Sequence, residues 1–353
     1  MSESPRRRLS WRKKLLFALV PLVALFVAAE IFARSYRAKK GSPFSTGSYR
    51  DQRIDLIRRG YPAAHDPLLG YVPRPGFASD DNRWHAMVTI DARAIRTNGA
   101  PRPPGERFVV AAGDSFTFGD QVGDHETWPA QLEQLLQRPV LNGGVFGYSL
   151  AQTVLRAERL VESHPTERLV LSFIPDDIKR CEQSRRFTEI PWFDLVDGEL
   201  ALRGVPVPDS AVDNDLDRQY LRRLLGHSAA LDMLFWNTVP NWWVSEQREI
   251  WVHPPGTGLT IGKKLFERLG RFCAERQLPW LVVLQGHWSA DESHGAAELL
   301  AHAAACGAEV LDLQTAFLAL ADEDKSLWYK YFRGHMTAAG NAWVAAGIAA
   351  RLR

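Results

Sequence analysis

The sequence predicts an α/β fold built on a parallel, doubly wound sheet. From residue 107 onward, short apolar segments alternate with helical segments, an order typical of strand–helix–strand units. A serine in a glycine-rich turn follows the first apolar segment, at the place where such sheets bind ligands. Hydrophobic residues make up 46% and charged residues 24% of the 353-residue chain, which argues against a disordered or polytopic membrane protein.

The N-terminus predicts a single membrane-spanning helix. Residues 15–33 are apolar except for Glu30, and at about 1.5 Å per residue they can cross a hydrocarbon core of roughly 30 Å. Six basic residues lie within positions 1–14, against four just after the span, which predicts a cytoplasmic tail and an extracytoplasmic bulk. A cleaved signal peptide and a buried helix are the alternatives, although no small-x-small cleavage motif precedes Arg34.

Residues 34–106 are rich in Pro, Gly, Asp and Arg and are expected to form an accessory segment and linker, with a pair of short strands within 86–95. The domain that follows, 107–353, carries the alternating pattern. Its expected strands lie at 107–112, 139–144, 168–174, 279–285 and 308–313. Its expected helices lie at 127–137, 150–163, 263–276, 296–306 and 338–353.

Residues 181–262 interrupt this alternation and are expected to form a cap inserted after the third strand. The dipeptide Asp197-Gly198 suits a two-residue hairpin turn, and two helices are expected after it. Four of the chain's twelve Trp lie between Trp236 and Trp251. Such a cluster is typical of a small satellite core, and the alternative is a wall that lines the substrate site.

Charge and cysteine content argue against a nucleic-acid-binding protein, a zinc protein and a disulfide-stabilised protein. Lys and Arg number 43 against 41 Asp and Glu, and without the basic tail the chain is slightly acidic, which argues against nucleic-acid binding. Cys181, Cys273 and Cys306 lack the spacing of a zinc site and are odd in number, so we expect neither a metal site nor a disulfide framework. The sequence has no P-loop or dinucleotide fingerprint, and no cofactor is expected.

The sharpest chemical signal is Gly113-Asp114-Ser115 at the end of the first strand, with Gly119 closing a tight turn. Parallel strands present their carboxyl ends to the ligand, and glycine lets backbone amides approach a reacting group. Ser115 is therefore a candidate nucleophile. The alternative is a serine that only caps the following turn.

Two further segments reach the same edge of the sheet. The stretch NGGVFGYS follows the second strand and includes Gly147, whose amide can donate to an oxyanion. His335 lies just before the last helix, where an imidazole can act as general base towards Ser115. For His335 the alternative is a capping or surface role.

These segments resemble blocks of the GDSL-like, or SGNH, hydrolase superfamily, over residues 107–353. GDSFTFG matches the nucleophile block, NGGVFG the second block and GHMTAAGN the histidine block. The resemblance implies a flavodoxin-like, three-layer α/β/α sandwich around a five-stranded parallel sheet, and cleavage or transfer of acyl esters. It also implies Ser115 as nucleophile, His335 as base, and the amides of Ser115 and Gly147 as the oxyanion hole.

The sequence departs from the family pattern twice. The third block, usually G-x-N-D, reads Ile174-Pro175-Asp176-Asp177, so a carboxyl replaces the amide that donates to the oxyanion. An ionised carboxylate there would repel developing negative charge. The acid that normally precedes the histidine by two or three residues is absent, because Phe332 and Arg333 occupy those positions.

Four possibilities for His335 remain open at this stage. Asp176 or Asp177 can supply the missing acid, because the third strand ends at the same edge. A bare Ser–His dyad is the second, and an acid from Asp312 or from 322–324 is the third. The fourth is a protein that has lost catalysis.

The expected function is a serine esterase of the cell envelope, acting on a glycan or lipid ester through an acyl-enzyme on Ser115. The alternatives are an O-acyltransferase that modifies an envelope polysaccharide, and a non-catalytic envelope binding protein. The membrane, through the N-terminal helix, and an ester substrate are the expected partners, and the sequence makes no prediction of oligomeric state.

Overall fold

The computed structural model groups the chain into two units. One consists of residues 1–56 and 213–248, and the other of residues 57–212 and 249–353. The structure describes residues 10–39, 47–51, 62–80, 86–100, 107–186, 188–209, 220–239, 242–243, 249–288 and 292–353. Most of the predicted basic tail and the Pro-rich stretch at 101–106 lie outside the described residues.

In the described residues, the larger unit is built on a five-stranded parallel sheet. Its strand order is β13-β12-β7-β5-β6. The strands are β5 (Phe108–Ala112), β6 (Val140–Asn142), β7 (Thr166–Phe173), β12 (Trp280–Leu284) and β13 (Glu309–Asp312). The three central strands are buried along most of their length, which explains why they read as continuous apolar runs.

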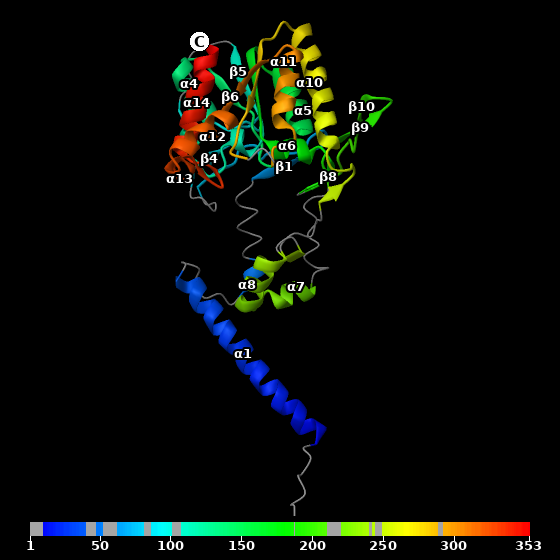
Figure 1. The fold of residues 1–353 in the computed structure, drawn as a ribbon, viewed down its shortest axis with the longest axis vertical. Coiled ribbons are helices and arrows are strands. Elements are labelled where there is room, and N and C mark those ends of the chain that lie inside the picture. Colours follow the sequence, from blue (N-terminus) through cyan, green and yellow to red (C-terminus); the bar gives the residue numbers. More distant parts are fainter. Residues whose placement is uncertain are drawn as a thin grey trace, which may run out of the picture. The chain divides into compact units, whose positions relative to one another are not determined.

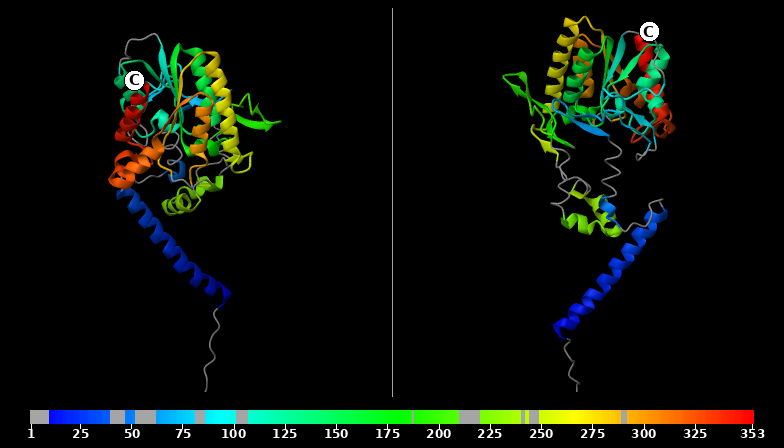
Figure 2. Two further views of the ribbon diagram at one scale, coloured as in Figure 1. Left: turned by 45° about the horizontal axis from the view of Figure 1, so that its top comes forward. Right: turned by 180° about the vertical axis from the view of Figure 1, so that it is seen from behind.

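Helices cover both faces of this sheet (Figures 1 and 2). One face carries α5 (Leu150–Ser163), α10 (Thr257–Glu275) and α11 (Ala296–Ala305), and the other carries α4 (Trp128–Leu136), α12 (Leu313–Glu323) and α14 (Ala338–Leu352). A hydrophobic core lies on each face of the sheet, and alternate residues of each strand pack into one or the other. In β12, Val282 packs on one side and Val283 on the other. The predicted three-layer α/β/α sandwich is confirmed.

Residues 62–100 pack into the larger unit. Four short strands form here: β1 (Ala63–Asp66), β2 (Gly70–Pro73), β3 (Ala78–Ser79) and β4 (Val88–Thr89). The side chains of Tyr71 and Ile95 belong to the core on the α5 face, and the Tyr71 hydroxyl donates to the Phe146 carbonyl. The strand pair expected within 86–95 differs, because β4 pairs with β3 and only an isolated bridge joins Ile90 to Arg96.

The segment predicted as one cap is divided between the two units. The larger unit holds β8 (Gln183–Arg185), β9 (Trp192–Val196), β10 (Glu199–Arg203) and β11 (Ile250–Trp251). The β9–β10 hairpin turns at Asp197-Gly198, as predicted, with both residues at positive φ, as a primed turn requires. The two helices that follow, α7 (Tyr220–Leu225) and α8 (Ala229–Thr238), belong to the smaller unit.

The smaller unit is built around α1 (Trp11–Lys39). In the described part of the chain, α1 is the one helix long and apolar enough to cross a membrane. Glu30 of α1 caps α8: its carboxylate accepts hydrogen bonds from the Ser228 hydroxyl at 2.7 Å and from the amides of Ala229 and Ala230 at 3.0 and 2.9 Å. The single acid of the predicted span therefore supplies the side-chain cap of a second helix.

Candidate active site

Ser115 lies at the carboxyl end of β5, as the first residue of the short helix α3 (Ser115–Phe118). Asp114 caps this helix by accepting from the Phe116 amide at 2.9 Å. Gly113 permits the turn, since a Cβ there would collide with the Thr117 side chain. The nucleophile candidate is thus fixed by a strand end and a side-chain cap, and it is almost fully buried.

His335 is brought to Ser115 by a hairpin near the end of the chain. It begins β15 (His335–Met336), which pairs with β14 (Phe332–Arg333) around Gly334. Its Nε2 lies 3.0 Å from the Ser115 Oγ. The imidazole also packs on the Phe116 ring, with centroids 5.3 Å apart. This geometry lets His335 accept the serine proton.

A carboxylate that the sequence analysis did not single out faces the same imidazole. Asp120 Oδ2 lies 3.6 Å from His335 Nε2, and the Asp120 side chain is buried. Because Nε2 is also the atom that faces Ser115, Asp120 is not placed to orient the ring through Nδ1. It lies instead where positive charge develops once the imidazole has taken a proton. The signal was present in the sequence, since Asp120 directly follows the nucleophile block.

Arg96 fixes the loop that carries Asp120. The buried Arg96 guanidinium donates to the carbonyls of Phe118, Gly119 and Val122, each at 2.7 Å, and to the Asp124 carboxylate at 3.0 Å. Arg96 comes from the segment predicted to be a linker. That segment therefore contributes to the position of the site.

We expect Arg96→Met to lower the free energy of unfolding by about 3–5 kcal/mol, because it leaves the buried Asp124 without its ion-pair partner. Urea denaturation followed by circular dichroism measures this. Arg93→Ala is the matched control, since that side chain is exposed, and its effect should stay within about 0.5 kcal/mol. Equal effects of the two substitutions would contradict the role given to Arg96.

The structure gives Asp176 and Asp177 a different partner from the one the sequence analysis considered. Both lie in α6 (Pro175–Arg180), where Arg180 follows one turn later. Arg180 lies 2.5 Å from Asp177 Oδ1 and 3.7 Å from Asp176 Oδ2. Among the described residues, no hydrogen bond or ion pair joins either carboxylate to His335. The helical turn directs both side chains to Arg180 instead.

The other acids considered are engaged in local structure. Asp312 caps α12 by accepting from the Thr315 amide at 2.8 Å. Asp322 pairs with Lys325 at 2.7 Å, and Asp324 accepts from the Ser326 amide at 2.9 Å. Within the described residues, Asp120 is the carboxylate that an ion pair joins to His335.

Arg180 links the carboxyl ends of three strands. Its Nη1 donates to Asp177 after β7 at 2.5 Å, to the Tyr148 carbonyl after β6 at 3.0 Å, and to Asp114 after β5 at 3.4 Å. The Ser115 Oγ lies 3.3 Å from the same Asp114 oxygen. A buried positive charge therefore lies one carboxylate away from the candidate nucleophile. The sequence signal for it was an arginine four residues after the atypical Asp176.

Asp177 is a strongly perturbed carboxyl group. Burial raises the pKa of Asp177 well above its usual value, and the charge of Asp114 adds to this effect, while Arg180 opposes it. One guanidinium faces two buried carboxylates and cannot fully compensate both. The upward direction of the pKa shift therefore follows first from burial and second from the charge of Asp114.

Asp177 should therefore make the stability of the protein depend on pH. A carboxyl whose pKa is raised in the folded state stabilises the fold below its unfolded pKa of about 4, and this contribution is lost as the pH rises through the folded pKa. We expect the unfolding free energy of the wild type, relative to Asp177→Asn, to fall as the pH rises above about 4. Urea denaturation across a pH series measures this.

Gly147, the second predicted oxyanion residue, lies in the loop after β6 with φ of 70°. This loop runs against the nucleophile turn, because the Val145 amide donates to the Gly113 carbonyl at 3.0 Å. Gly144 allows the approach, since a Cβ there would collide with the backbone of Phe118. The structure thus places the loops that carry Ser115 and Gly147 side by side at one edge of the sheet.

Aromatic and amide side chains follow β12 near His335. The rings of Trp288 and Phe116 lie 5.7 Å apart, and those of His287 and Phe332 lie 4.6 Å apart. Burial lowers the pKa of His287, and His335 lowers it further. Gln285 is buried, and neither of its side-chain polar atoms has a hydrogen-bond partner in the described part of the chain.

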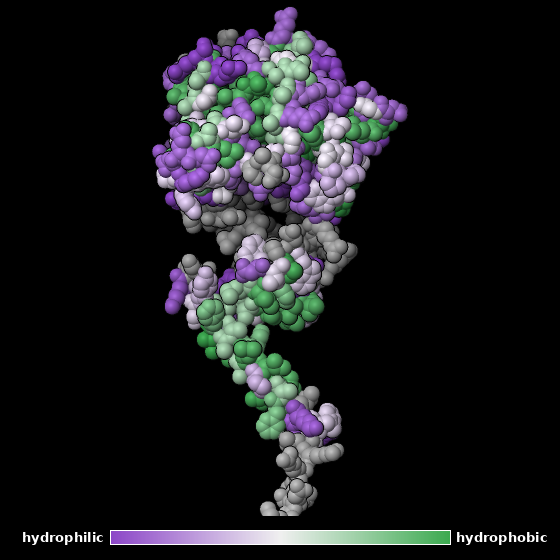
Figure 3. All heavy atoms as spheres, viewed as in Figure 1, coloured by the Kyte–Doolittle hydropathy of each residue, from purple (hydrophilic) through white to green (hydrophobic). Residues whose placement is uncertain are grey.

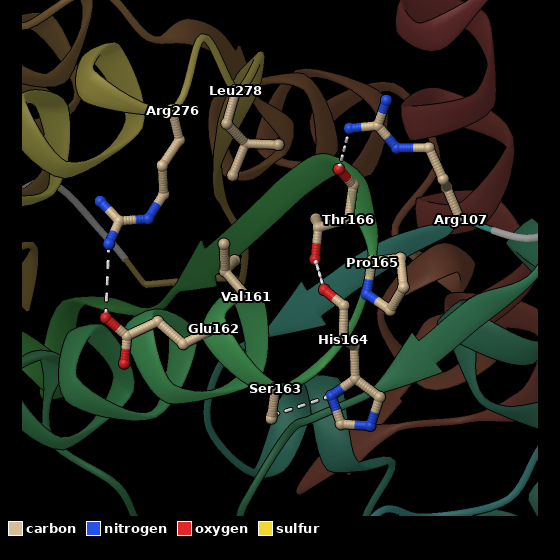
Figure 4. Close-up of a pocket in the computed structure, with 9 residues that line it drawn as sticks. All are labelled: Arg107, Val161, Glu162, Ser163, His164, Pro165, Thr166, Arg276 and Leu278. Carbon is tan, nitrogen blue, oxygen red and sulfur yellow. Dashed lines mark hydrogen bonds and ion pairs between the residues drawn. The ribbon is translucent and has the colours of Figure 1, made fainter.

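A surface pocket lies at the other edge of the sheet (Figure 4). It surrounds the junction of α5 with the amino end of β7, whereas Ser115 follows the carboxyl end of β5. Its lining residues are Arg107, Val161, Glu162, Ser163, His164, Pro165, Thr166, Arg276 and Leu278. It is therefore separate from the Ser115–His335 pair. The described residues contain no group of three or more His, Cys, Asp or Glu able to hold a metal ion.

Comparison with known proteins yields structural neighbours only. No family model matches the sequence, and no curated protein matches it. A putative lipolytic protein of the G-D-S-L family from Desulfitobacterium hafniense DCB-2 is 14% identical, with a TM-score of 0.40, over 69% of this chain and 98% of that one. AlinE4, described as an SGNH-hydrolase family esterase, is 16% identical, with a TM-score of 0.34, over 70% of this chain and 96% of that one.

A third neighbour is a catalytic mutant of Axe2, an acetylxylan esterase from Geobacillus stearothermophilus. It is 14% identical, with a TM-score of 0.35, over 70% of this chain and 94% of that one. Two of the three descriptions name the GDSL or SGNH family that the sequence blocks resemble. At these identities the likeness concerns the fold alone.

Proposed function

We propose that this protein is a serine esterase of the SGNH type, in which Ser115 attacks an acyl ester and His335 acts as base. The observation that carries the proposal is the 3.0 Å contact between His335 Nε2 and Ser115 Oγ at the carboxyl edge of the sheet. The base takes the serine proton as the new carbon–oxygen bond forms, and gives it to the departing alcohol. Water then hydrolyses the acyl-enzyme by the same steps in reverse.

The tetrahedral oxyanion would be held by the amides of Ser115 and Gly147. The family asparagine is replaced here by Asp176, which is half exposed and lies 3.7 Å from Arg180. The buried guanidinium of Arg180 supports a different solution. It donates to the Asp114 oxygen that also lies beside the Ser115 Oγ, so the substrate oxyanion would develop near this positive charge.

Asp120 takes part of the role of the absent triad acid. It lies 3.6 Å from His335 Nε2, and so it stabilises the imidazolium that forms after proton transfer. It does not hold the ring through the other nitrogen. The proposed machinery is therefore a Ser–His dyad with a carboxylate on the reacting side of the imidazole.

The substrate we propose is an acyl ester of a glycan or lipid in the cell envelope. Two features support this location: α1 is long and apolar enough to span a membrane, and more basic residues precede the span than follow it. The larger unit, which carries Ser115 and His335, then lies on the extracytoplasmic side.

Labelling of the full-length protein with a fluorophosphonate tests the proposal. The probe should modify Ser115 of the wild type, identified by mass spectrometry of the labelled peptide, and Ser115→Ala should give no labelling. Labelling of His335→Ala should be slower by orders of magnitude, because the hydroxyl then lacks its base. An unlabelled wild type with a normal circular dichroism spectrum would point to a binding protein.

A further inference from the structure

We propose that α7, α8 and the following Trp242 and Trp243 form a platform that lies in the membrane interface beside α1. This inference rests on the proposal that α1 spans the bilayer. The occupant of its exposed apolar surface is the lipid itself, at the boundary between the acyl chains and the headgroups. Four features of the smaller unit support it: the polarity of α8, the size of its core, its exposed side chains and its depth.

The polarity of α8 is inverted relative to a helix on a water-soluble protein. Its sequence, AALDMLFWNT, contains one charged residue, Asp232, and that side chain is completely buried. Leu234, in contrast, is exposed. Charged groups that face the interior of a helix pair, with apolar groups outside, are typical of segments surrounded by lipid.

The interior of the smaller unit is held by charge pairs. Asp232 pairs with Arg37 of α1 at 2.5 Å and accepts from the Trp243 indole at 2.8 Å. Glu30 pairs with Arg34 at 2.6 Å and caps α8. Each of these two carboxylates has a guanidinium partner, as charged groups in or near a membrane require.

Among the described residues, the apolar core of this unit is small. The buried apolar cluster consists of Ala33, Tyr49 and Ala229, with Ala230 partly buried, and Trp243 is also buried. A domain of this size normally needs a larger core, a disulfide or a metal. Burial of its outer face in lipid supplies the missing apolar burial.

The outer face carries large apolar side chains. Leu221, Leu224 and Leu234 are 63%, 56% and 52% exposed, and Tyr220 is 75% exposed. Figure 3 shows this apolar surface on α7 and α8 next to the apolar surface of α1. Exposed apolar surface that continues from a membrane span indicates contact with the same bilayer.

The depth of the platform follows from its attachment to α1. The contacts lie between Glu30 and Arg37, which are separated by about 10 Å along the helix and flank the end of the apolar run. This is the level of the headgroup region. Arg222 packs over Trp242 at 5.2 Å and donates to its carbonyl, a combination of Trp and Arg that suits anionic headgroups.

Spin-label accessibility in the full-length protein tests this. Nitroxides are attached to cysteines introduced as Leu221→Cys, Leu224→Cys or Leu234→Cys, with Cys306→Ser because the other two native cysteines are buried. The protein is reconstituted in nanodiscs of phosphatidylcholine and phosphatidylglycerol. Collisions with oxygen, which enters lipid, are compared with collisions with a water-soluble nickel chelate. The controls are Val23→Cys in α1 and Val196→Cys, an apolar residue exposed on the β9–β10 hairpin.

We expect the oxygen-to-nickel ratio at the three platform positions to be about tenfold that at Val196, and to approach that at Val23. Platform positions as open to nickel as Val196, with Val23 protected, would overturn the platform, leave the span intact, and point to a protein partner for this face. A Val23 position open to nickel would overturn the membrane span and the platform together. Neither result depends on esterase activity, because none of these positions touches Ser115 or His335.

Discussion

Replacing His335 with alanine should lower kcat for an aryl acetate by about 10³–10⁴-fold, while the free energy of unfolding changes by no more than about 1 kcal/mol. The large kinetic effect is expected because His335 Nε2 lies 3.0 Å from the Ser115 hydroxyl, and an unactivated serine is a weak nucleophile. The small effect on stability is expected because the ring is only partly buried. Steady-state kinetics with p-nitrophenyl acetate and urea denaturation measure the two quantities.

The matched control is His125→Ala, an exposed histidine in the turn that follows the Asp120 loop, which should keep kcat within about twofold. Asp120→Asn separates the role of the nearby carboxylate. It should lower kcat about tenfold in the wild type and have no effect in the His335→Ala background, because it acts through the imidazolium. If His335→Ala retained a tenth or more of wild-type turnover, His335 would not be the base.

The sheet and the meeting of Ser115 with His335 could be predicted because they follow from simple rules. Continuous apolar runs separated by helices specify buried parallel strands, and the carboxyl ends of such strands share one edge. Ser115 follows β5 directly, and the His335 hairpin closes onto it just before α14. The position after a strand was enough to predict that Ser115 lies at that edge, whereas for His335 a capping or surface role stayed open and the hairpin that carries it was not predicted.

The partners of the site carboxylates could not be predicted in this way. Proximity to the same edge allowed Asp176 or Asp177 to reach His335, but the helix that begins at Pro175 brings Arg180 back to both within one turn. Which way a side chain points at a strand end depends on whether a helix starts there. A strand-level prediction does not contain that information.

The helices of the smaller unit were expected, but the association of α8 with α1 could not be predicted, for a different reason. An apolar helix such as α8 has the same composition whether a protein core or a lipid surrounds it, so the pattern alone cannot distinguish the two. The deciding facts are three-dimensional: Asp232 faces Arg37, and Leu234 faces outward. The contact of Glu30 with the amino end of α8 joins residues about 200 positions apart, and nothing in the local sequence encodes it.

The double substitution Arg180→Met with Asp177→Asn should be more stable than Arg180→Met alone, although Asp114 still loses its contact with the guanidinium, and yet lower kcat by about 10²–10³-fold relative to the wild type. Arg180→Met alone leaves the Asp177 carboxylate buried without its partner, which should lower the unfolding free energy by about 3–5 kcal/mol and obscure any effect on rate. The second substitution removes that charge, so the remaining loss of kcat reports on the guanidinium beside the nucleophile. Urea denaturation and steady-state kinetics give both quantities for the single and double variants.

Asp177→Asn alone supplies the control, because it keeps the guanidinium, and its kcat should stay within about tenfold of the wild type. A positive charge near the oxyanion stabilises the transition state and not the bound neutral ester. The double variant should therefore show a lower kcat with little change in KM. A double variant that recovers wild-type kcat would show that Arg180 only neutralises Asp177. A loss that persists after the carboxylate is gone means that the positive charge replaces the amide which this site lacks at Asp176.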